Sequence, residues 1–447
     1  MNKRKAVFRM NDEKGHMYFP VLCNDLLPSR LRRLFCIRPG CCTSAGSEAQ
    51  STASDDPIKI GFLLPKSGGY APMGALAQAA IEMALEDYDN QINGRPIQVC
   101  IEDTQSDASV AVQMAQKLIE KEGCTVICGP ESGSCALAVK EYAPNAPDVT
   151  FILNGGSEDE TMRTVYDNVY RCSITGAQSC WGLGEYAVKE LGWKKFVTIA
   201  PDNDFQYSQI AGFVTTTTLA GGEIVDRMWF PEVGNDFSSL IAQIPTDIDA
   251  IFLAAGGSNG ADFLKQYKEY GLTIPILGGH SVVDELTIHT PEIGAVIEGT
   301  YGTTTVAHDI GTEAFNTFNE RHIEKVGYPA SIMTLEPYLA ISVALNALEK
   351  VGGDLADVEA LRAALNETDL DTPTGKFHFD DYRQGLFTVY ITQVTKAEDG
   401  SFYNKKLGVF ENQGQFGPFD PDWYQSQPSP DRTNPTIEAI QSAKYAA

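Results

Sequence analysis

The sequence predicts an α/β protein with two lobes, each built on a doubly wound parallel sheet. Short apolar runs alternate with segments of helical spacing, and this alternation pauses after residue 153 and restarts at residue 182. Such alternation is typical of parallel sheets covered by helices, because each parallel connection needs a crossover. A length of 447 residues leaves room for about two to three domains.

The first round of the pattern opens with residues 58–64, an apolar run that ends at Pro65 and therefore indicates a buried strand. Helical spacing follows, and Asn93-Gly94 stops it. Ser106 or Asp107 is the expected N-cap of the next helix. The predicted strands of this round are 58–64, 97–101, 125–128 and 149–153, and its helices include 76–87 and 134–142.

The second round has the same composition and links of similar length. Its predicted strands are 196–200, 223–229, 250–254 and 274–277, and its helices are 182–191, 208–219, 236–243 and 261–270. A third stretch returns to helices at 333–350 and 354–365, followed by strands at 376–379 and 386–393. The tail from residue 414 onward shows little periodicity.

The charge of the chain is unevenly distributed. The net charge of −25 argues against nucleic acid as a partner, since phosphate binding requires a basic surface. Of the 34 basic and 59 acidic residues, nine and six lie in residues 1–56, which leaves 25 and 53 for the body. Residues 1–56 are therefore interpreted as a leader and disordered head. Their apolar stretch is too short for an ordinary secretion signal, so we expect an atypical leader or a start codon assigned too early.

The six cysteines of the body indicate neither a metal nor a redox site. Their positions are 100, 124, 128, 135, 172 and 180, and none forms a CxxC pair of zinc-binding type. Buried free thiols are the expected state. Cys172 and Cys180 are the pair that could instead form a disulfide in an oxidising compartment.

The loops that follow the strands are expected to carry the function, because ligands bind beyond the carboxyl ends of parallel strands. These loops hold no dinucleotide or nucleotide phosphate motif, so no cofactor is predicted. No cluster of nucleophile, acid and base is apparent, so catalytic and metal-ligating residues are predicted to be absent. Glycines and serines stand instead at helix starts, where backbone N–H groups can hold a carboxylate. A serine in this place could equally act as a helix N-cap.

Five short motifs follow one another along residues 57–395. They are Ser67-Gly68-Gly69-Tyr70-Ala71, Gly129 to Ser134, Asn154-Gly155-Gly156-Ser157, Asp204-Phe205-Gln206-Tyr207 and Thr372 to Asp380. Together they resemble the type I periplasmic binding proteins, the solute receptors of ABC importers for branched-chain amino acids, amides and aromatic acids. The resemblance implies a Venus-flytrap fold in which three segments cross a hinge. It places lobe 1 at 58–176 plus 301–385 and lobe 2 at 177–300 plus 386–447.

The resemblance also implies a ligand cleft between the lobes and a set of contact residues. In lobe 1 these are Ser132, Gly133, Ser134, Gly155 and Ser157, which would hold a carboxylate, with Tyr70 nearby. In lobe 2 they are Phe205, Tyr207, Gly257 and His280, with Gln178 near the crossing.

Three departures from the family pattern bear on the ligand. Gly133 stands where the family usually has serine. Leucine-type members of the family resemble one another in having an aromatic residue near the position of Gly257. They also have an acidic residue at the position of His280, which holds the α-ammonium group of the ligand. Without that acid, and with Phe205 and Tyr207 in the cleft, an aromatic or other apolar carboxylate is favoured. An amino acid and an amide or urea are the alternatives.

The resemblance therefore implies a periplasmic substrate-binding protein of an ABC transporter, a monomer that binds a small carboxylate without altering it. Membrane permease subunits would be its protein partners. A ligand-sensing receptor module of the same fold is one alternative. An enzyme on a doubly wound fold is another, and conversion of a ligand into a product would distinguish it.

Overall fold

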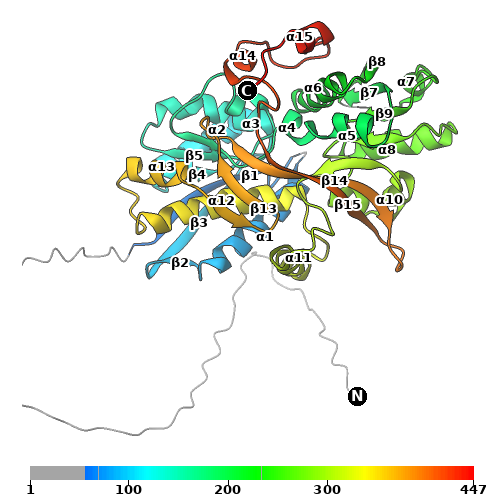
Figure 1. Cartoon of the computed structure of the whole chain (residues 1–447). Coiled ribbons are helices and arrows are strands. Elements are labelled where there is room, and N and C mark those ends of the chain that lie inside the picture. Colours follow the sequence, from blue (N-terminus) through cyan, green and yellow to red (C-terminus); the bar gives the residue numbers. More distant parts are fainter. Residues whose placement is uncertain (1–55, 69, 233, 447) are drawn as a thin grey trace, which may run out of the picture. The chain divides into compact units, whose positions relative to one another are not determined.

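The computed structural model describes residues 56–68, 70–232 and 234–446, and Figure 1 shows their arrangement. Residues from Ala53 onward form one compact unit. The leader and head predicted for residues 1–56 lie outside the described residues, apart from Asp56. The predicted fold class is confirmed, because the body contains two lobes with separate sheets whose central strands are parallel.

The sheet of lobe 1 has six strands in the order β2-β3-β1-β4-β5-β6. The central strand β1 pairs on both sides, so that Phe62 faces Ile101 on one neighbour and Cys128 on the other. Helices also cover both faces of the sheet at this strand, which explains its continuous apolar run. The strands are β1 (Ile58–Leu64), β2 (Gln91–Ile92), β3 (Arg95–Asp103), β4 (Val126–Cys128), β5 (Thr150–Leu153) and β6 (Val169–Arg171).

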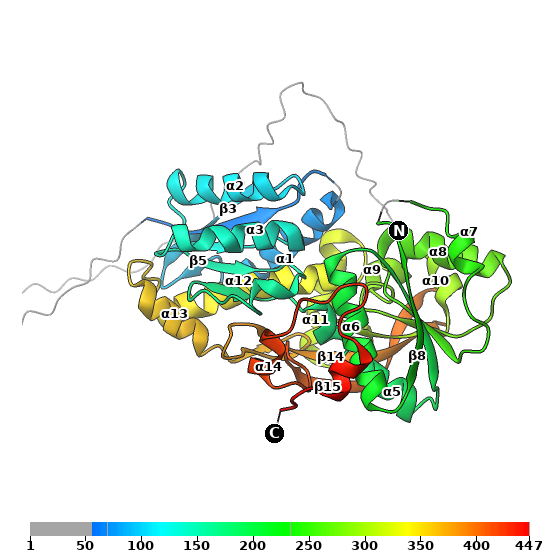
Figure 2. The same ribbon diagram turned by 90° about the horizontal axis from the view of Figure 1, so that it is seen from above.

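Helices cover both faces of this sheet. One face packs against α1 (Ala71–Asp87) and α12 (Ile332–Lys350), with α11 (Glu313–Val326) and α13 (Val358–Asn366) beside them. The other face packs against α2 (Ala108–Glu120) and α3 (Gly133–Tyr142), which lie side by side in Figure 2. Two short 3-10 helices, Ala143–Asn145 and Glu158–Glu160, complete the lobe.

The sheet of lobe 2 has nine strands in the order β12-β13-β14-β11-β10-β9-β7-β8, and β15 pairs with β14. Its strands from β7 to β11 are parallel, and the remaining strands join antiparallel. The strands are β7 (Lys195–Pro201), β8 (Glu223–Phe230), β9 (Ala250–Leu253), β10 (Ile276–Gly278), β11 (Tyr301–Thr304), β12 (Leu370–Thr372), β13 (Gly375–Phe379), β14 (Gly385–Lys396) and β15 (Phe402–Gln413).

Helices α5 and α6 pack on one face of this sheet, and α8, α9 and α10 pack on the other. The helices are α4 (Gly176–Cys180), α5 (Leu183–Lys189), α6 (Asp204–Leu219), α7 (Ser238–Ile241), α8 (Gly257–Glu269), α9 (Glu285–Ile288), α10 (Pro291–Ile297), α14 (Pro421–Gln425) and α15 (Ile437–Gln441). No helix in the described ranges combines the length and the apolar character that a membrane span requires.

The C-terminal tail, residues 414–446, contacts both lobes. The Tyr424 hydroxyl donates to Glu158 of lobe 1 at 3.0 Å. Arg432 donates from its Nε to Asp202 of lobe 2 at 2.8 Å. The tail contains α14 and α15, and Ile440 of α15 is buried against α6. The tail thus contacts the lobes through single residues spaced along it, which explains why its sequence shows little periodicity.

Five strands lie where the sequence pattern predicts none, namely β2, β6, β11, β12 and β15. The first four have only two to four residues, and β15 includes the adjacent charged residues Lys405 and Lys406. Pairing with a neighbouring strand stabilises such segments, and no periodicity of their own reveals them. Because β11 pairs with β10, the lobe boundary predicted at residue 301 falls within the second sheet. The other predicted lobe boundaries stay a prediction.

The cysteines of the body are free thiols, and all except Cys100 are buried. Cys172 and Cys180 are both among them, so the alternative of a disulfide between these two residues is not realised. Burial raises the pKa of the Cys180 thiol to about 12, which keeps it protonated.

Candidate functional site

Two loops of lobe 1 touch at the carboxyl edge of its sheet. The serine loop, residues 131–134, follows β4, and the glycine loop, residues 154–157, follows the adjacent parallel strand β5. A Cβ atom added at Gly133 would lie 2.4 Å from the Ser157 Oγ, which is far inside van der Waals contact. A side chain at position 133 would therefore have to displace the Ser157 hydroxyl, so glycine favours the close approach of the two loops.

The serine loop leads directly into helix α3, with Ser132 in extended backbone conformation at the N-cap. The Ser132 hydroxyl accepts no hydrogen bond from the α3 backbone, and its Oγ lies 3.2 Å from the Ser134 Oγ instead. The expected N-cap role of Ser132 is therefore not seen. The start of α3 keeps its N–H donors and the positive end of its dipole available, both of which favour an anion.

Buried charges hold the glycine loop in place. The Ser157 N–H donates to the Glu160 Oε1 at 3.0 Å, and the Arg171 guanidinium donates to the Ser157 carbonyl oxygen. Arg171 is 0% exposed and Ser157 is 6% exposed. Burial raises the pKa of Glu160 to about 7, although the charge of Arg171 acts in the opposite direction. The loop is thus fixed through its backbone, which leaves its conformation little freedom.

Glu158 links the glycine loop to lobe 2, a role that the sequence reasoning missed. Its Oε1 accepts from the Ser208 Oγ of helix α6 at 3.0 Å and from the Tyr424 hydroxyl of the tail. Burial raises the pKa of Glu158, and nearby Arg163 opposes this shift. The run of three acidic residues after Ser157 indicates a polar surface, so only the tertiary contacts reveal this buried bridge.

Helix α6 presents its two predicted aromatic residues to different surroundings. A Cβ added at Gly156 would lie 2.7 Å from the Phe205 ring, so Phe205 reaches the glycine loop of lobe 1. Tyr207 packs edge-on against Trp229, with 4.9 Å between ring centroids, and its hydroxyl donates to Asp202. Residues two apart on a helix do not share a face. The structure therefore brings Phe205 to the loops of lobe 1 and directs Tyr207 toward β8.

His280 lies inside lobe 2, just beyond β10, and is 1% exposed. Its ring nitrogen Nε2 accepts from the Thr305 backbone N–H at 3.3 Å. The backbone N–H of His280 donates to the Gln209 Oε1 at 3.1 Å. Burial lowers the pKa of His280 to about 4, so the ring is neutral near pH 7. Gly257 is exposed at the start of α8, while Gly256 packs on Ser281, the neighbour of His280.

Gln178 lies at the crossing between the lobes, and its amide is fully hydrogen-bonded within the protein. The amide nitrogen donates to the carbonyl oxygens of Gly385 and Gln413, at 2.8 and 2.6 Å. The amide oxygen accepts from the Thr175 N–H and from the Gln384 side chain, each at 3.1 Å. These four bonds match the donors and acceptors of an amide. Gln178 therefore ties the crossing strands together.

Tyr70 is the N-cap residue of α1 and is 40% exposed. Its backbone N–H donates to the Ser106 Oγ at 3.2 Å. Burial raises the pKa of its phenol, and smaller contributions come from Glu232 of lobe 2 and Cys135 of α3. The ring thus stands near α3 on its own lobe and under the electrostatic influence of the opposite lobe.

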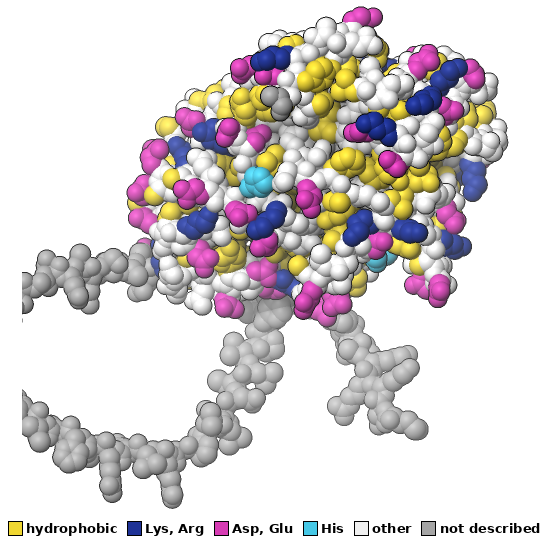
Figure 3. All heavy atoms as spheres, in the orientation of Figure 1, with side chains coloured by type: hydrophobic (Ala, Val, Ile, Leu, Met, Phe, Trp, Pro, Cys, Tyr) yellow, Lys and Arg dark blue, Asp and Glu magenta, His cyan; other side chains and the backbone are white. Residues whose placement is uncertain are grey.

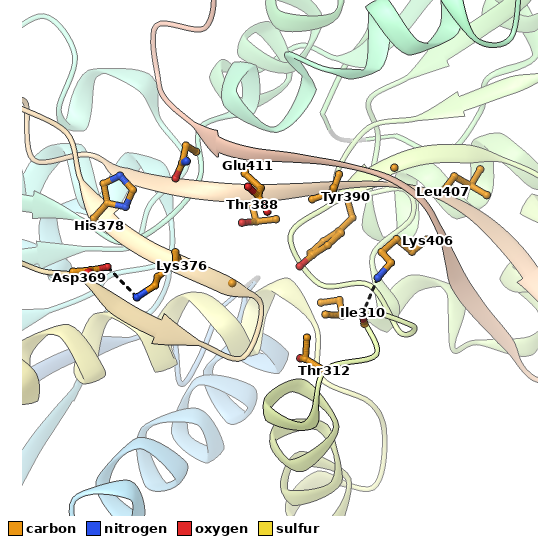
Figure 4. Close-up of a pocket in the computed structure, with 14 residues that line it drawn as sticks. Ile310, Thr312, Asp369, Lys376, His378, Thr388, Tyr390, Lys406, Leu407 and Glu411 are labelled. Atoms are coloured by element: carbon orange, nitrogen blue, oxygen red, sulfur yellow. Dashed lines mark hydrogen bonds and ion pairs between the residues drawn. The ribbon is translucent and has the colours of Figure 1, made fainter.

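Two cavities lie away from these loops. One of about 730 Å³ is on the outer side of β13, β14 and β15, between Tyr390 and Thr312 (Figure 4). Two of its lysines are already engaged, Lys376 with Asp369 and Lys406 with the Ile310 carbonyl oxygen. A second cavity of about 300 Å³ lies between α5, α6 and the tail. Neither is lined by any of the predicted contact residues.

The described residues contain no group of three or more His, Cys, Asp or Glu side chains arranged to hold a metal ion. Figure 3 shows acidic and basic side chains interspersed over the visible face, with apolar areas between them. This face carries no extended basic surface of the kind that binds a phosphate backbone.

Comparison with known proteins gives a consistent result. A family model described as periplasmic binding protein matches residues 57–400. The Leu/Ile/Val-binding protein homolog 6 of Brucella melitensis biotype 1 is 26% identical over 380 residues, which cover 83% of this chain and 96% of the relative.

Solved structures resemble the chain over most of its length. An ABC transporter substrate-binding protein from Sphaerobacter thermophilus superposes with a TM-score of 0.77 at 27% identity, covering 80% of this chain and 99% of its own. A second structure is a solute-binding protein of an ABC transporter from Rhodopseudomonas palustris BisB5, in complex with 3,4-dihydroxybenzoic acid. It superposes with a TM-score of 0.74 at 27% identity, and the match covers 81% of this chain and 99% of the other chain.

Proposed function

Because the chain belongs to the periplasmic binding protein family, we propose that it is the exported substrate-binding protein of an ABC transporter. It captures one small carboxylate between its lobes and releases it unaltered to the permease subunits in the membrane. The similarity in fold to ABC transporter proteins, over nearly their whole length and about four fifths of this chain, supports this role. Contacts of the ligand with both lobes would favour a closed form that the permease recognises.

The observation that carries the proposal is the contact between the serine and glycine loops at the start of α3. Gly133 and Ser157 touch there, and the first N–H groups of α3 are left without a side-chain cap. Phe205 approaches the same place from lobe 2. Hydrogen-bond donors on one side and an aromatic ring on the other suit an anion with an apolar body.

An aromatic carboxylate is the ligand class that we propose. His280 is neutral and buried, so lobe 2 offers no charge at this position for an α-ammonium group. The structurally similar protein from Rhodopseudomonas palustris binds 3,4-dihydroxybenzoic acid, a ligand of this class. An amino acid remains the second candidate, since the Brucella relative carries the name of a Leu/Ile/Val-binding homolog.

A thermal-shift series on the full chain tests the ligand class. Benzoate, 3,4-dihydroxybenzoate, leucine and urea are added separately, and a ligand present at 100 times its Kd stabilises the protein by about 2.7 kcal/mol. We expect the aromatic acids to raise the Tm, and mass spectrometry to recover them unchanged. A response to leucine alone would favour the amino acid, and a response to urea alone would contradict a carboxylate receptor.

Export and transport need a cellular experiment. Cell fractionation is expected to find the protein outside the cytoplasm, and deletion of its gene is expected to reduce uptake of the ligand identified above. Unchanged uptake together with altered gene expression would instead favour the sensing-receptor alternative.

A further inference from the structure

Glu131, the first residue of the serine loop, has a buried carboxyl group with no partner. Neither of its carboxyl oxygens is accessible to solvent, and neither has a hydrogen-bond partner among the described residues. A buried polar group without a hydrogen bond is costly to the folded state, so proteins rarely retain one without a use. The residue directly precedes Ser132 at the carboxyl edge of the sheet, where the ligand is proposed to bind.

The surroundings of Glu131 are rich in carboxyl groups. Its nearest electrostatic partner is Glu336 on α12, which itself is influenced by Glu160, Asp284 and Arg171. Glu336 thus links the other three carboxyl groups electrostatically, and Arg171 is the cation among the described residues that acts on it. Arg171 directs its Nε to Gln384 and its Nη1 to the Ser157 carbonyl oxygen, so it does not hydrogen-bond any of the four carboxyl groups. Carboxyl groups therefore outnumber cationic groups in this linked set.

The other three carboxyl groups each accept a backbone hydrogen bond. Glu336 accepts from the Ile174 N–H at 3.1 Å, and Glu160 accepts from Ser157. Asp284, which comes from lobe 2, accepts from the Ile332 N–H at the start of α12, at 3.1 Å. Glu131 is the member of this group whose need for a donor is met by nothing in the described protein. A molecule that enters between the lobes can meet it.

Glu131 and Ser132 are adjacent at the carboxyl edge of the sheet, and their side chains point in different directions. Ser132 has extended backbone angles, φ −72° and ψ 125°. Successive side chains of an extended chain point to opposite sides, so the Glu131 carboxyl and the Ser132 hydroxyl diverge. A carboxylate held by α3 and the glycine loop would leave the body of the ligand free to approach Glu131.

We propose that Glu131, which alone among these four described carboxyl groups lacks a donor, selects carboxylate ligands that carry a second O–H or N–H donor. The inference rests on the proposed function and narrows its ligand class. A hydroxyl group would bond to the neutral acid. An ammonium group would bond to the ionised carboxylate of Glu131, and the other carboxyl groups nearby would stabilise the positive charge of the ammonium group. Burial and the nearby Glu336 raise the pKa of Glu131 well above its usual range, which favours the hydroxyl.

Isothermal titration of the full chain measures this selection with four probes: benzoate, 3-hydroxybenzoate, 4-hydroxybenzoate and 4-(aminomethyl)benzoate. The wild type is expected to bind its preferred donor-bearing probe at least about tenfold more tightly than benzoate, the contribution of one good hydrogen bond. Glu131→Leu is expected to bring that ratio close to one. Glu131→Gln is expected to keep a preference for a hydroxyl probe and to lose any preference for the aminomethyl probe.

Glu141→Gln is the matched control, because Glu141 is an exposed residue of the same helix α3 and its ratio should equal that of the wild type. Circular dichroism confirms that each variant is folded, and the isosteric Glu131→Gln keeps the test valid if the leucine variant does not fold. An unchanged ratio in both Glu131 variants, or a wild type that prefers benzoate, overturns the inference and leaves the carboxylate receptor intact. A wild type that binds none of the four probes, nor leucine, overturns the carboxylate function and this inference with it.

Discussion

The loops of lobe 1 and those of lobe 2 face each other, but different interactions hold them. In lobe 1, Arg171 and Glu160 fix the backbone of the glycine loop from within the protein. In lobe 2, neutral groups take this role, since the Gln209 amide holds His280 and the Phe205 ring rests on Gly156. Buried ionic networks orient a loop precisely, whereas apolar packing adapts more easily to shape. Lobe 1 is therefore suited to hold the polar end of a ligand, and lobe 2 to cover its body.

Removal of the central cation of lobe 1 is expected to have the largest effect. Arg171→Leu would leave the Ser157 carbonyl oxygen buried without its donor and would remove the positive charge that favours the ionised form of buried Glu160. We expect the free energy of unfolding to fall by about 3–5 kcal/mol, as for other broken buried ion pairs, and ligand binding to be lost. Urea denaturation measures the change. Lys189→Ala, which breaks an exposed pair with Glu185, is the control and should cost about 0.5 kcal/mol or less.

The contact between the two loops of lobe 1 can be tested by adding a side chain. Gly133→Ser would place a Cβ 2.4 Å from the Ser157 Oγ and 3.2 Å from the Ser157 N, so the hydroxyl must rotate away and the loops must shift slightly. We expect a loss of about 1–3 kcal/mol in stability and weaker binding of a carboxylate ligand, measured by denaturation and titration. Gly408→Ala is the matched control, because its nearest atom would be 3.6 Å away. Equal tolerance of both substitutions would contradict the loop contact.

The pH dependence of stability follows from the buried carboxyl groups. Burial raises the pKa of Glu160 to about 7 and that of Glu336 to about 8. A raised pKa means that the folded state binds the proton more tightly, so this contribution is full below the ordinary pKa of 4.5, is lost as the pH rises from there to about 7 for Glu160 and about 8 for Glu336, and changes no further above those values. Each group loses about 1.4 kcal/mol per pH unit over that interval. Thermal unfolding should show a lower Tm at high pH, and Glu336→Gln should reduce the slope.

A comparison of one polar group from each lobe gives the smallest predicted effect. Ser157→Ala is expected to weaken binding of a carboxylate about tenfold, since it removes a hydroxyl that would bond to a charged group. His280→Ala is expected to weaken it less, because the ring nitrogen Nε2 already accepts from Thr305 within lobe 2. Titration of both variants with the same ligand measures the difference. A larger loss in His280→Ala would place the polar end of the ligand in lobe 2.

The site of lobe 2 shows where sequence reasoning reached its limit. The motif Asp204 to Tyr207 correctly indicates a helix start, yet it cannot tell which of Phe205 and Tyr207 faces lobe 1. Gln178 was predicted as a ligand contact near the crossing, and its location at the crossing is seen, but its amide is used by the strands there. Whether the eleven predicted residues contact a ligand stays a prediction.

The sequence by itself determined most of the order of strands and helices, the two-lobed α/β class and the family. Apolar periodicity records whether each residue is buried within its own element, and this information is local. The tertiary structure alone decided that Gly133 touches Ser157, that Arg171 supports a loop of its lobe, and that Glu131 lacks a donor. These features depend on distances between segments far apart in the chain, and no spacing along the sequence encodes such distances.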